Sequence, residues 1–264
     1  MTLSPITRNL AGAVALMTLA VVADGALAAE KLFATDASVR TILAFKVSDA
    51  AAQKLLPDGW QISPASTGPS KNANLTITFV DPLTVQNADG TPAEPVRIAA
   101  IAIPAKKTGT DGSVPMVGPG FASNLSYVPG PYGGFAAATA TVDRHIHSGP
   151  DGKANIEEAW EFKGEGGDSI QLQLQYVSGV PIRSKAEATP HSAAKPDFYR
   201  IYRFEQAADV VRSTAAGVDH AQKYSFKATG TKLSPLFDGS EQLVSITSVP
   251  FYSRQIFLPE QVTQ

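Results

Sequence analysis

The sequence predicts a mostly β protein with a single folded domain and one or two short helices. Segments rich in β-branched and aromatic residues recur along the chain, and clusters of Gly, Pro, Asn and Asp separate them. Removing the 28 residues of a predicted signal peptide leaves 236 of the 264 residues, a length that suits one β sandwich or barrel. We therefore divide the chain into a signal peptide, residues 1–28, and one domain, residues 29–264.

The N-terminal segment has the three parts of a secretory signal peptide. Arg8 supplies positive charge, residues 10–23 form a weakly apolar run, and Ala26 and Ala28 give the small-x-small pattern that precedes cleavage. The run is shorter than the ~20 apolar residues that a membrane-spanning helix needs. An uncleaved membrane anchor is the alternative. We expect cleavage after Ala28, a periplasmic or secreted mature protein, and no stable membrane insertion afterwards.

The first part of the domain predicts strands around a short helix. Residues 39–47 are rich in β-branched and aromatic residues, which is typical of a strand. Ser48 then provides an N-cap for a helix over 50–56, which Pro57-Asp58-Gly59 ends. Residues 75–80 alternate with period two, and the nearly all-apolar segment 98–104 predicts a strand buried on both faces.

The middle of the chain predicts an antiparallel meander. Residues 136–147, 154–162 and 170–176 are expected strands, and glycine-rich turns at 149–152 and 164–168 separate them.

Three more strands are expected toward the C-terminus, at residues 198–204, 223–232 and 243–257. Residues 180–196 are rich in Ala, Pro, Ser and charge, which predicts a long surface loop.

Composition excludes several functions. The chain has no cysteine, so it has neither a thiol nucleophile nor a thiolate metal site. A net charge of −2 gives no reason to expect a nucleic acid or an anionic membrane as a partner. The sequence contains no Gly-x-Ser-x-Gly motif and no phosphate-binding loop. We expect no cofactor.

The order of these segments resembles the acetoacetate decarboxylase-like superfamily over roughly residues 39–259. A strand and a short helix with a Leu-Leu-Pro stop occupy residues 45–59. Near the C-terminus, residues 228–237 lead into the strand at 243–249, and residues 251–259 close the chain. The resemblance implies curved antiparallel sheets that form a cone-like or closed barrel around a small apolar pocket.

In this superfamily the decarboxylases form an imine through one of two adjacent lysines, whose pKa the neighbouring ammonium and desolvation depress. The segment that best matches this position is Gly134-Phe135-Ala136-Ala137-Ala138, with alanines in place of the lysines. The acidic residue expected at the start of the preceding apolar strand is also replaced, because Arg97 and Ile98 stand there.

Arg40 matches an arginine that the superfamily uses to hold the substrate carboxylate. The Pro- and Gly-rich segment 128–135 borders the pocket in the superfamily, so Tyr132 and Phe135 are expected to line its apolar side. A rigid bend without contact to a ligand is the alternative for this segment.

Lys106 and Lys107 form the one remaining candidate pair for imine chemistry. Adjacent ammonium groups lower each other's pKa, but a useful shift also requires burial. The following residues, Thr-Gly-Thr-Asp-Gly-Ser, favour an exposed hairpin, and therefore a solvated pair.

His145 and His147 are candidate metal ligands. Residues two apart on a strand share a face, and Glu157, Glu158 or Glu161 of the next strand could supply a third ligand. A polar outer face near a hairpin is the alternative.

Taken together, the sequence predicts an exported protein that binds a small carboxylate or carbonyl compound without Schiff-base catalysis. A lyase or decarboxylase that uses Lys106 or Lys107 is the first alternative, and a metal-dependent enzyme that uses the two histidines is a weaker one. Whether the protein forms an oligomer is left open.

Overall fold

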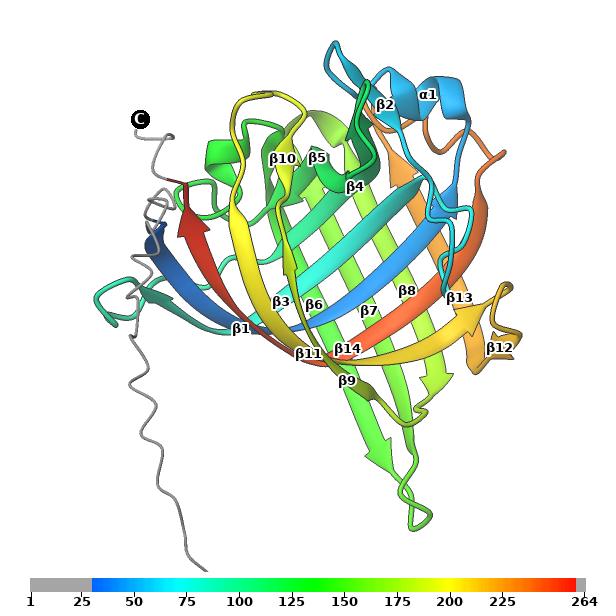
Figure 1. Cartoon of the computed structure of the whole chain (residues 1–264). Helices are drawn as coiled ribbons and strands as arrows, with labels where there is room; N and C mark the ends of the chain where they lie inside the picture. Colours follow the sequence, from blue (N-terminus) through cyan, green and yellow to red (C-terminus); the bar gives the residue numbers. More distant parts are fainter. Residues whose placement is uncertain (1–29, 260–264) are drawn as a thin grey trace, which may run out of the picture.

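The computed structural model describes residues 30–259, and these form a strongly curled β structure (Figure 1). One α-helix, α1 (Asp49–Gln53), and two 3-10 turns, η1 (Gly130–Tyr132) and η2 (Glu165–Gly167), are found in this part of the chain. The strands are β1 (Lys31–Lys46), β2 (Trp60–Ile62), β3 (Leu75–Asn87), β4 (Ile98–Lys107), β5 (Ser113–Ala122), β6 (Phe135–Ser148), β7 (Ala154–Gly164), β8 (Ser169–Val177), β9 (Ile182–Ala188), β10 (His191–Ser192), β11 (Ile201–Ser213), β12 (Val218–Asp219), β13 (Ala221–Thr229) and β14 (Gln242–Leu258). The predicted mostly β class is confirmed.

All 14 strands belong to one sheet, whose main path runs β12–β11–β14–β1–β3–β4–β5–β6–β7–β8–β13. The short strands β2 and β10 pair with β4 and β5, and β9 pairs with β11. The sheet is mixed rather than purely antiparallel, because β5 runs parallel to both β6 and β10. Within the described residues the sheet curls without being closed into a ring by hydrogen bonds.

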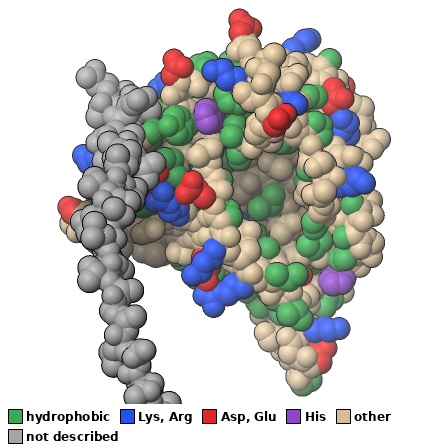
Figure 2. Space-filling view, in the orientation of Figure 1, with side chains coloured by type: hydrophobic (Ala, Val, Ile, Leu, Met, Phe, Trp, Pro, Cys, Tyr) green, Lys and Arg blue, Asp and Glu red, His purple; other side chains and the backbone are tan. Residues whose placement is uncertain are grey.

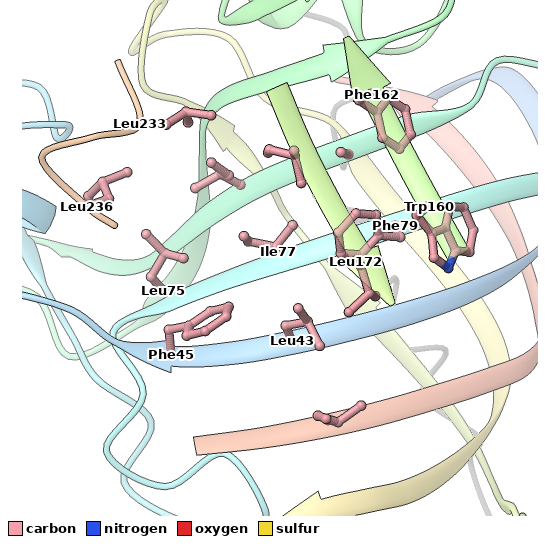
Figure 3. Close-up of a cluster of buried hydrophobic side chains, with 14 of the residues drawn as sticks. Leu43, Phe45, Leu75, Ile77, Phe79, Trp160, Phe162, Leu172, Leu233 and Leu236 are labelled. Carbon is pink, nitrogen blue, oxygen red and sulfur yellow. The ribbon is translucent and has the colours of Figure 1, made fainter. Parts of the chain in front are cut away.

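The main hydrophobic core fills the space inside the curl. Figure 3 shows side chains of β1 and β3 on one side and of β7 and β8 on the other. Phe79 contributes to this core with its ring 5.5 Å from the ring of Trp160, and both side chains are fully buried. Each such side chain stabilises the fold by about 1.5–3 kcal/mol through burial.

Strand β1 is buried on different faces in its two halves. In the first half the even-numbered residues Asp36, Ser38 and Arg40 are buried, whereas in the second half Leu43 and Phe45 enter the main core. We call the first surface the Arg40 face and the second the core face. The two faces place a polar cluster and an apolar core on opposite sides of one strand.

The predicted helix is present but shorter than residues 50–56. Its N-cap is Ser48, whose Oγ accepts a hydrogen bond from the Ala51 amide at 3.4 Å. The amides of Leu55 and Leu56 bond to carbonyls three residues back, so the last turn tightens out of the α-helical pattern.

The prediction of a loop over residues 180–196 is wrong, because β9 and β10 lie within it. Strand β9 is at an edge and is exposed on both faces over most of its length. A strand without a buried face lacks the apolar alternation that identifies strands in sequence. Strand β5 was not anticipated either, because its prolines and glycines resemble a turn.

The predicted signal peptide and its cleavage after Ala28 lie outside the described residues. Among residues 30–259, no helix has the length and apolar character needed to cross a membrane.

Candidate ligand-binding site

Neighbouring strands extend the Arg40 face on both sides of β1. Arg40 lies opposite Val80 of β3 and Val249 of β14, and Ser38 lies opposite Tyr252. Directly opposed residues project to the same side of a sheet. The register therefore surrounds Arg40 with apolar and aromatic side chains from two other strands.

The Arg40 guanidinium is held by groups on this face. Its Nε donates to Ser38 Oγ at 2.9 Å, and its Cζ lies 3.2 Å from the centre of the Tyr252 ring. Its Nη2 lies 3.7 Å from Asp36 Oδ1, within ion-pair range but beyond hydrogen-bond distance. Arg40 Nη2 is buried and has no hydrogen-bond partner among the described residues.

Asp36 is bound instead to a second buried arginine. Arg254 Nε donates to Asp36 Oδ2 at 2.7 Å, and the Arg254 guanidinium also lies over the Tyr202 ring at 4.3 Å. The cluster thus contains two guanidinium groups, from Arg40 and Arg254, around one carboxylate.

The two arginines differ in electrostatic balance. Burial lowers the pKa of Arg40 to about 10, and nearby Tyr252 and Asp36 offset this only in part. Burial also acts to lower the pKa of Arg254, but its interaction with Asp36 and nearby tyrosines raises the pKa above the usual arginine value. The protein therefore compensates the charge of Arg254 well and the charge of Arg40 only in part.

Tyr132 lies in η1 and joins this cluster through other side chains. Its hydroxyl is 2.9 Å from the Tyr202 hydroxyl, and its carbonyl accepts a hydrogen bond from Ser192 Oγ at 2.6 Å. Tyr202 in turn lies against Arg254, which binds Asp36. Tyr132 is thus linked indirectly to the group beside Arg40.

Phe135 contributes to an apolar wall on the same side. It packs against a buried cluster that includes Val80, the residue opposite Arg40, together with Ile98 and Ala122. A cavity of about 20 Å³ lies beside the polar cluster. Asp36, Ser38, Val80, Pro82, Val85, Val96, Ile98, Tyr127, Val128 and Arg254 line it.

Of the three predicted ligand-binding residues, Arg40 lies in the polar cluster, Tyr132 is linked to it through Tyr202, and Phe135 packs against the apolar cluster that includes Val80. The structure does not bring the other candidates to this region.

Lys106 and Lys107 lie at the end of β4, opposite Gln61 and Trp60 of β2. Lys107 is exposed and Lys106 is half-buried, so neither has the burial on which imine-forming lysines depend. Within the described residues, no lysine is among the hydrogen-bond or ion-pair partners of Arg40, Asp36 or Arg254.

The alanines of the 134–138 segment lie at the start of β6. Ala136 and Ala137 are exposed and Ala138 is half-buried. Arg97 forms an ion pair with Asp81 at 3.0 Å.

His145 and His147 are exposed on β6, and His145 Nε2 lies 3.1 Å from Asp143 Oδ1. Glu157 is directly opposite His145, whereas Glu158 is buried. In the described part of the chain, no three His, Asp or Glu side chains are grouped closely enough to hold a metal ion.

A second polar network lies behind Arg40, on the core face. Glu158 is 4% exposed and accepts hydrogen bonds from Thr41 Oγ1 at 2.5 Å and Trp160 Nε1 at 2.9 Å. Arg144 Nε and the Tyr176 hydroxyl donate to its other oxygen at 3.3 and 3.4 Å. The Glu158 carboxylate therefore accepts hydrogen bonds from four donors. Three of them lie on other strands, β1, β6 and β8, and the fourth lies on β7 itself.

This network also reaches β14. The Tyr176 hydroxyl is also hydrogen-bonded to Ser248 Oγ, at 2.7 Å, and Ser248 lies opposite Thr41. Because Thr41 directly follows Arg40, the network fixes β1 and β14 immediately behind the Arg40 guanidinium.

Sequence reasoning missed Asp36, Arg254 and Tyr252 as site residues. The spacing in the sequence was the one available signal, since Asp36-x-Ser38-x-Arg40 and Tyr252-x-Arg254 each place polar side chains on one face of a strand. The spacing does not show that these two strands pair and bring Arg254 to Asp36.

Known proteins resemble this chain in structure and not in sequence. No protein-family model matches the sequence, and no curated protein matches it significantly. Among solved structures, the enduracididine biosynthesis enzyme MppR complexed with pyruvate matches with a TM-score of 0.52 and 13% identity, over 94% of this chain and 96% of that chain. MppR complexed with the condensation product of pyruvate and imidazole 4-carboxaldehyde matches at 0.51 and 11%, over 95% and 96%.

Acetoacetate decarboxylase from Legionella pneumophila matches with a TM-score of 0.51 and 10% identity, over 87% of this chain and 86% of that chain. At identities this low, the structural matches establish the fold alone. The protein is a curled, mostly β protein, and it shares the fold of MppR and of acetoacetate decarboxylase, the fold that the order of its segments predicted.

Proposed function

We propose that the chain binds a small carboxylate or carbonyl compound on the Arg40 face, without Schiff-base catalysis. The observation that carries this proposal is the Nη2 atom of Arg40, which is buried and has no hydrogen-bond partner among the described residues. A carboxylate is the usual partner of such a group, and charge-assisted hydrogen bonds to guanidinium are among the stronger ones in proteins.

The surroundings support a small ligand with an apolar part. Phe135 and Val80 offer apolar surface beside the guanidinium, and Tyr132 closes the cluster from η1. One structure with this fold is complexed with pyruvate, a compound of the expected size and charge. The proposal depends on Arg40 itself and not on the fold shared with that structure.

The absence of imine chemistry is proposed from the residues themselves. Alanines stand at the positions matched to the lysine pair, and Lys106 and Lys107 lie apart from the Arg40 cluster at the β4–β5 hairpin. We further propose that the mature protein is exported after cleavage of residues 1–28, on the basis of the sequence pattern.

The binding proposal is tested by calorimetric titration of the mature protein with propanoate, pyruvate and acetoacetate. Arg40→Met should weaken the affinity for these carboxylates at least about tenfold, because it removes a charge-assisted hydrogen bond. Arg183→Met is the matched control, since Arg183 is an exposed arginine paired with Glu205. Equal carboxylate affinities of the two variants would contradict the proposal.

Borohydride trapping with pyruvate and acetoacetate separates binding from lyase activity. We expect no covalent adduct by intact mass when a lysine-dependent decarboxylase labels normally under the same conditions. An adduct mapped to Lys106, Lys107 or another lysine would establish the imine-forming alternative. Metal analysis of the purified protein tests the weaker alternative at His145 and His147.

A further inference from the structure

Two buried polar atoms on the Arg40 face are complementary and unsatisfied. Arg40 Nη2 can only donate a hydrogen bond and Asp36 Oδ1 can only accept one, and neither has a hydrogen-bond partner within residues 30–259. The atoms are 3.7 Å apart, and the two side chains are 9% and 7% exposed. Leaving such groups unpaired is costly, so a ligand that supplies one acceptor and one donor side by side would satisfy both.

We propose that this pair recognises a 2-hydroxycarboxylate. The carboxylate accepts a hydrogen bond from Arg40 Nη2, and the hydroxyl on the adjacent carbon donates to Asp36 Oδ1. This inference rests on the proposed function and narrows it to one class of carboxylate. A simple carboxylate satisfies only Arg40, and a 2-oxo acid brings a carbonyl lone pair against the Asp36 carboxylate.

The charges of the cluster favour a hydroxyl over an ammonium as the donor. Arg40 and Arg254 carry two positive charges against the single negative charge of Asp36. Arg200, 3% exposed and stacked near Phe33 and Phe198, adds a third guanidinium close to the tyrosines of the cluster. A 2-hydroxycarboxylate brings one negative charge, whereas a zwitterionic amino acid brings no net charge.

Space and exposure are consistent with this orientation. The cavity of about 20 Å³ beside Asp36 suits a group the size of a hydroxyl. Beyond Arg40 the same face continues through Ile42, Thr78 and Ala100, which lie opposite one another and are only half-buried. Independently of these residues, Figure 2 shows that the face of the molecule drawn in Figure 1 is hollowed near its middle and that hydrophobic side chains lie in the hollow. The carbon chain of the ligand is expected on this more open side.

A series of three-carbon acids tests the proposal on the unmodified protein. Propanoate, pyruvate, lactate and alanine differ at the second carbon, where they carry no donor, a carbonyl, a hydroxyl and an ammonium group. Calorimetric titration at pH 7.5 should give a dissociation constant for one lactate enantiomer at least about tenfold below those of the other three acids. Both enantiomers of lactate are measured, because Asp36 and Arg40 have fixed positions on β1 and can match the hydroxyl and the carboxylate of only one enantiomer.

Asp36→Asn provides an independent readout. Arg254 Nε requires an acceptor, so the amide oxygen should take the place of Oδ2 and the amide nitrogen the place of Oδ1. A donor then stands where the acceptor was, and the preference should change from lactate toward pyruvate. Circular dichroism verifies that the variant is folded.

The outcomes separate this inference from the proposed function. Lactate, pyruvate and propanoate binding with equal affinity, all weakened by Arg40→Met, would overturn the hydroxy-acid inference and leave carboxylate binding intact. Alanine binding most tightly would overturn the choice of a hydroxyl donor. If none of the carboxylates binds, the proposed function fails with it.

Discussion

Removing the Glu158 carboxylate should destabilise the fold strongly, because four donors depend on it. In Glu158→Ala the hydroxyls of Thr41 and Tyr176, the indole N–H of Trp160 and the guanidinium of Arg144 lose a common acceptor. Removing one partner of a buried ion pair typically costs about 3–5 kcal/mol. Arg144 retains 15% side-chain exposure, so we expect about 3 kcal/mol, near the lower end of that range.

Urea denaturation monitored by tryptophan fluorescence measures this loss, since one of the two tryptophans lies in the network. Glu157→Ala is the matched control, because Glu157 is the neighbouring glutamate on the exposed side of β7. Its free energy of unfolding should stay within about 0.5 kcal/mol of the parent protein. If Glu158→Ala loses less than about 1 kcal/mol at an unchanged m-value, the network does not stabilise the strand behind Arg40 and our reasoning is refuted.

Three further predictions concern other parts of the molecule. Gly134→Ala should lower stability by about 1–3 kcal/mol, since its Cβ would lie 2.6 Å from a backbone oxygen of β5, whereas Gly112→Ala has open space and should leave the thermal midpoint unchanged. The affinity for carboxylates should stay constant from about pH 7 to 9 and fall as the pH rises through about 10, because Arg40 then loses the positive charge that binds the carboxylate. An unchanged affinity in a folded sample at pH 11 would contradict this prediction. The hydrogen bond from Lys46 lowers the pKa of Asp49, so its stabilising effect is present above the unfolded-state pKa of about 4 and lost as the pH falls through the lower folded-state value. Because Asp49 is exposed, Asp49→Asn should cost less than about 1 kcal/mol at pH 7 in chemical denaturation, and this cost should shrink as the pH is lowered through the folded-state pKa of Asp49.

The sequence predicted strands well where one face is buried and the other is not. Residues 170–176 alternate between apolar and polar side chains because they face the core and solvent in turn, and β8 occupies this segment. The same logic failed for β9, which has no buried face, and for β5, in which Pro115, Gly118 and Pro119 resemble a turn although the strand is paired.

The candidate site was only partly predictable. Arg40, Tyr132 and Phe135 came from the resemblance to a superfamily; in the structure Tyr132 is linked to the polar cluster of Arg40 through Tyr202, and Phe135 packs near Val80, which is opposite Arg40. The partner that makes this cluster distinctive is contributed by β14, since Arg254 is 218 positions from Asp36. A contact over that distance depends on the pairing of β1 with β14, which local patterns do not encode.

The position of Arg40 within β1 bears on how a ligand can enter. β1 pairs along nearly its whole length with both β3 and β14, so its amides should exchange with solvent only when the entire sheet opens. The arginine therefore projects from one of the slowest-opening segments of the molecule, and its backbone cannot yield to admit a ligand. The ligand is therefore expected to enter from the more open side of the Arg40 face, beside Ile42, Thr78 and Ala100. Binding should leave amide exchange in β1 unaltered.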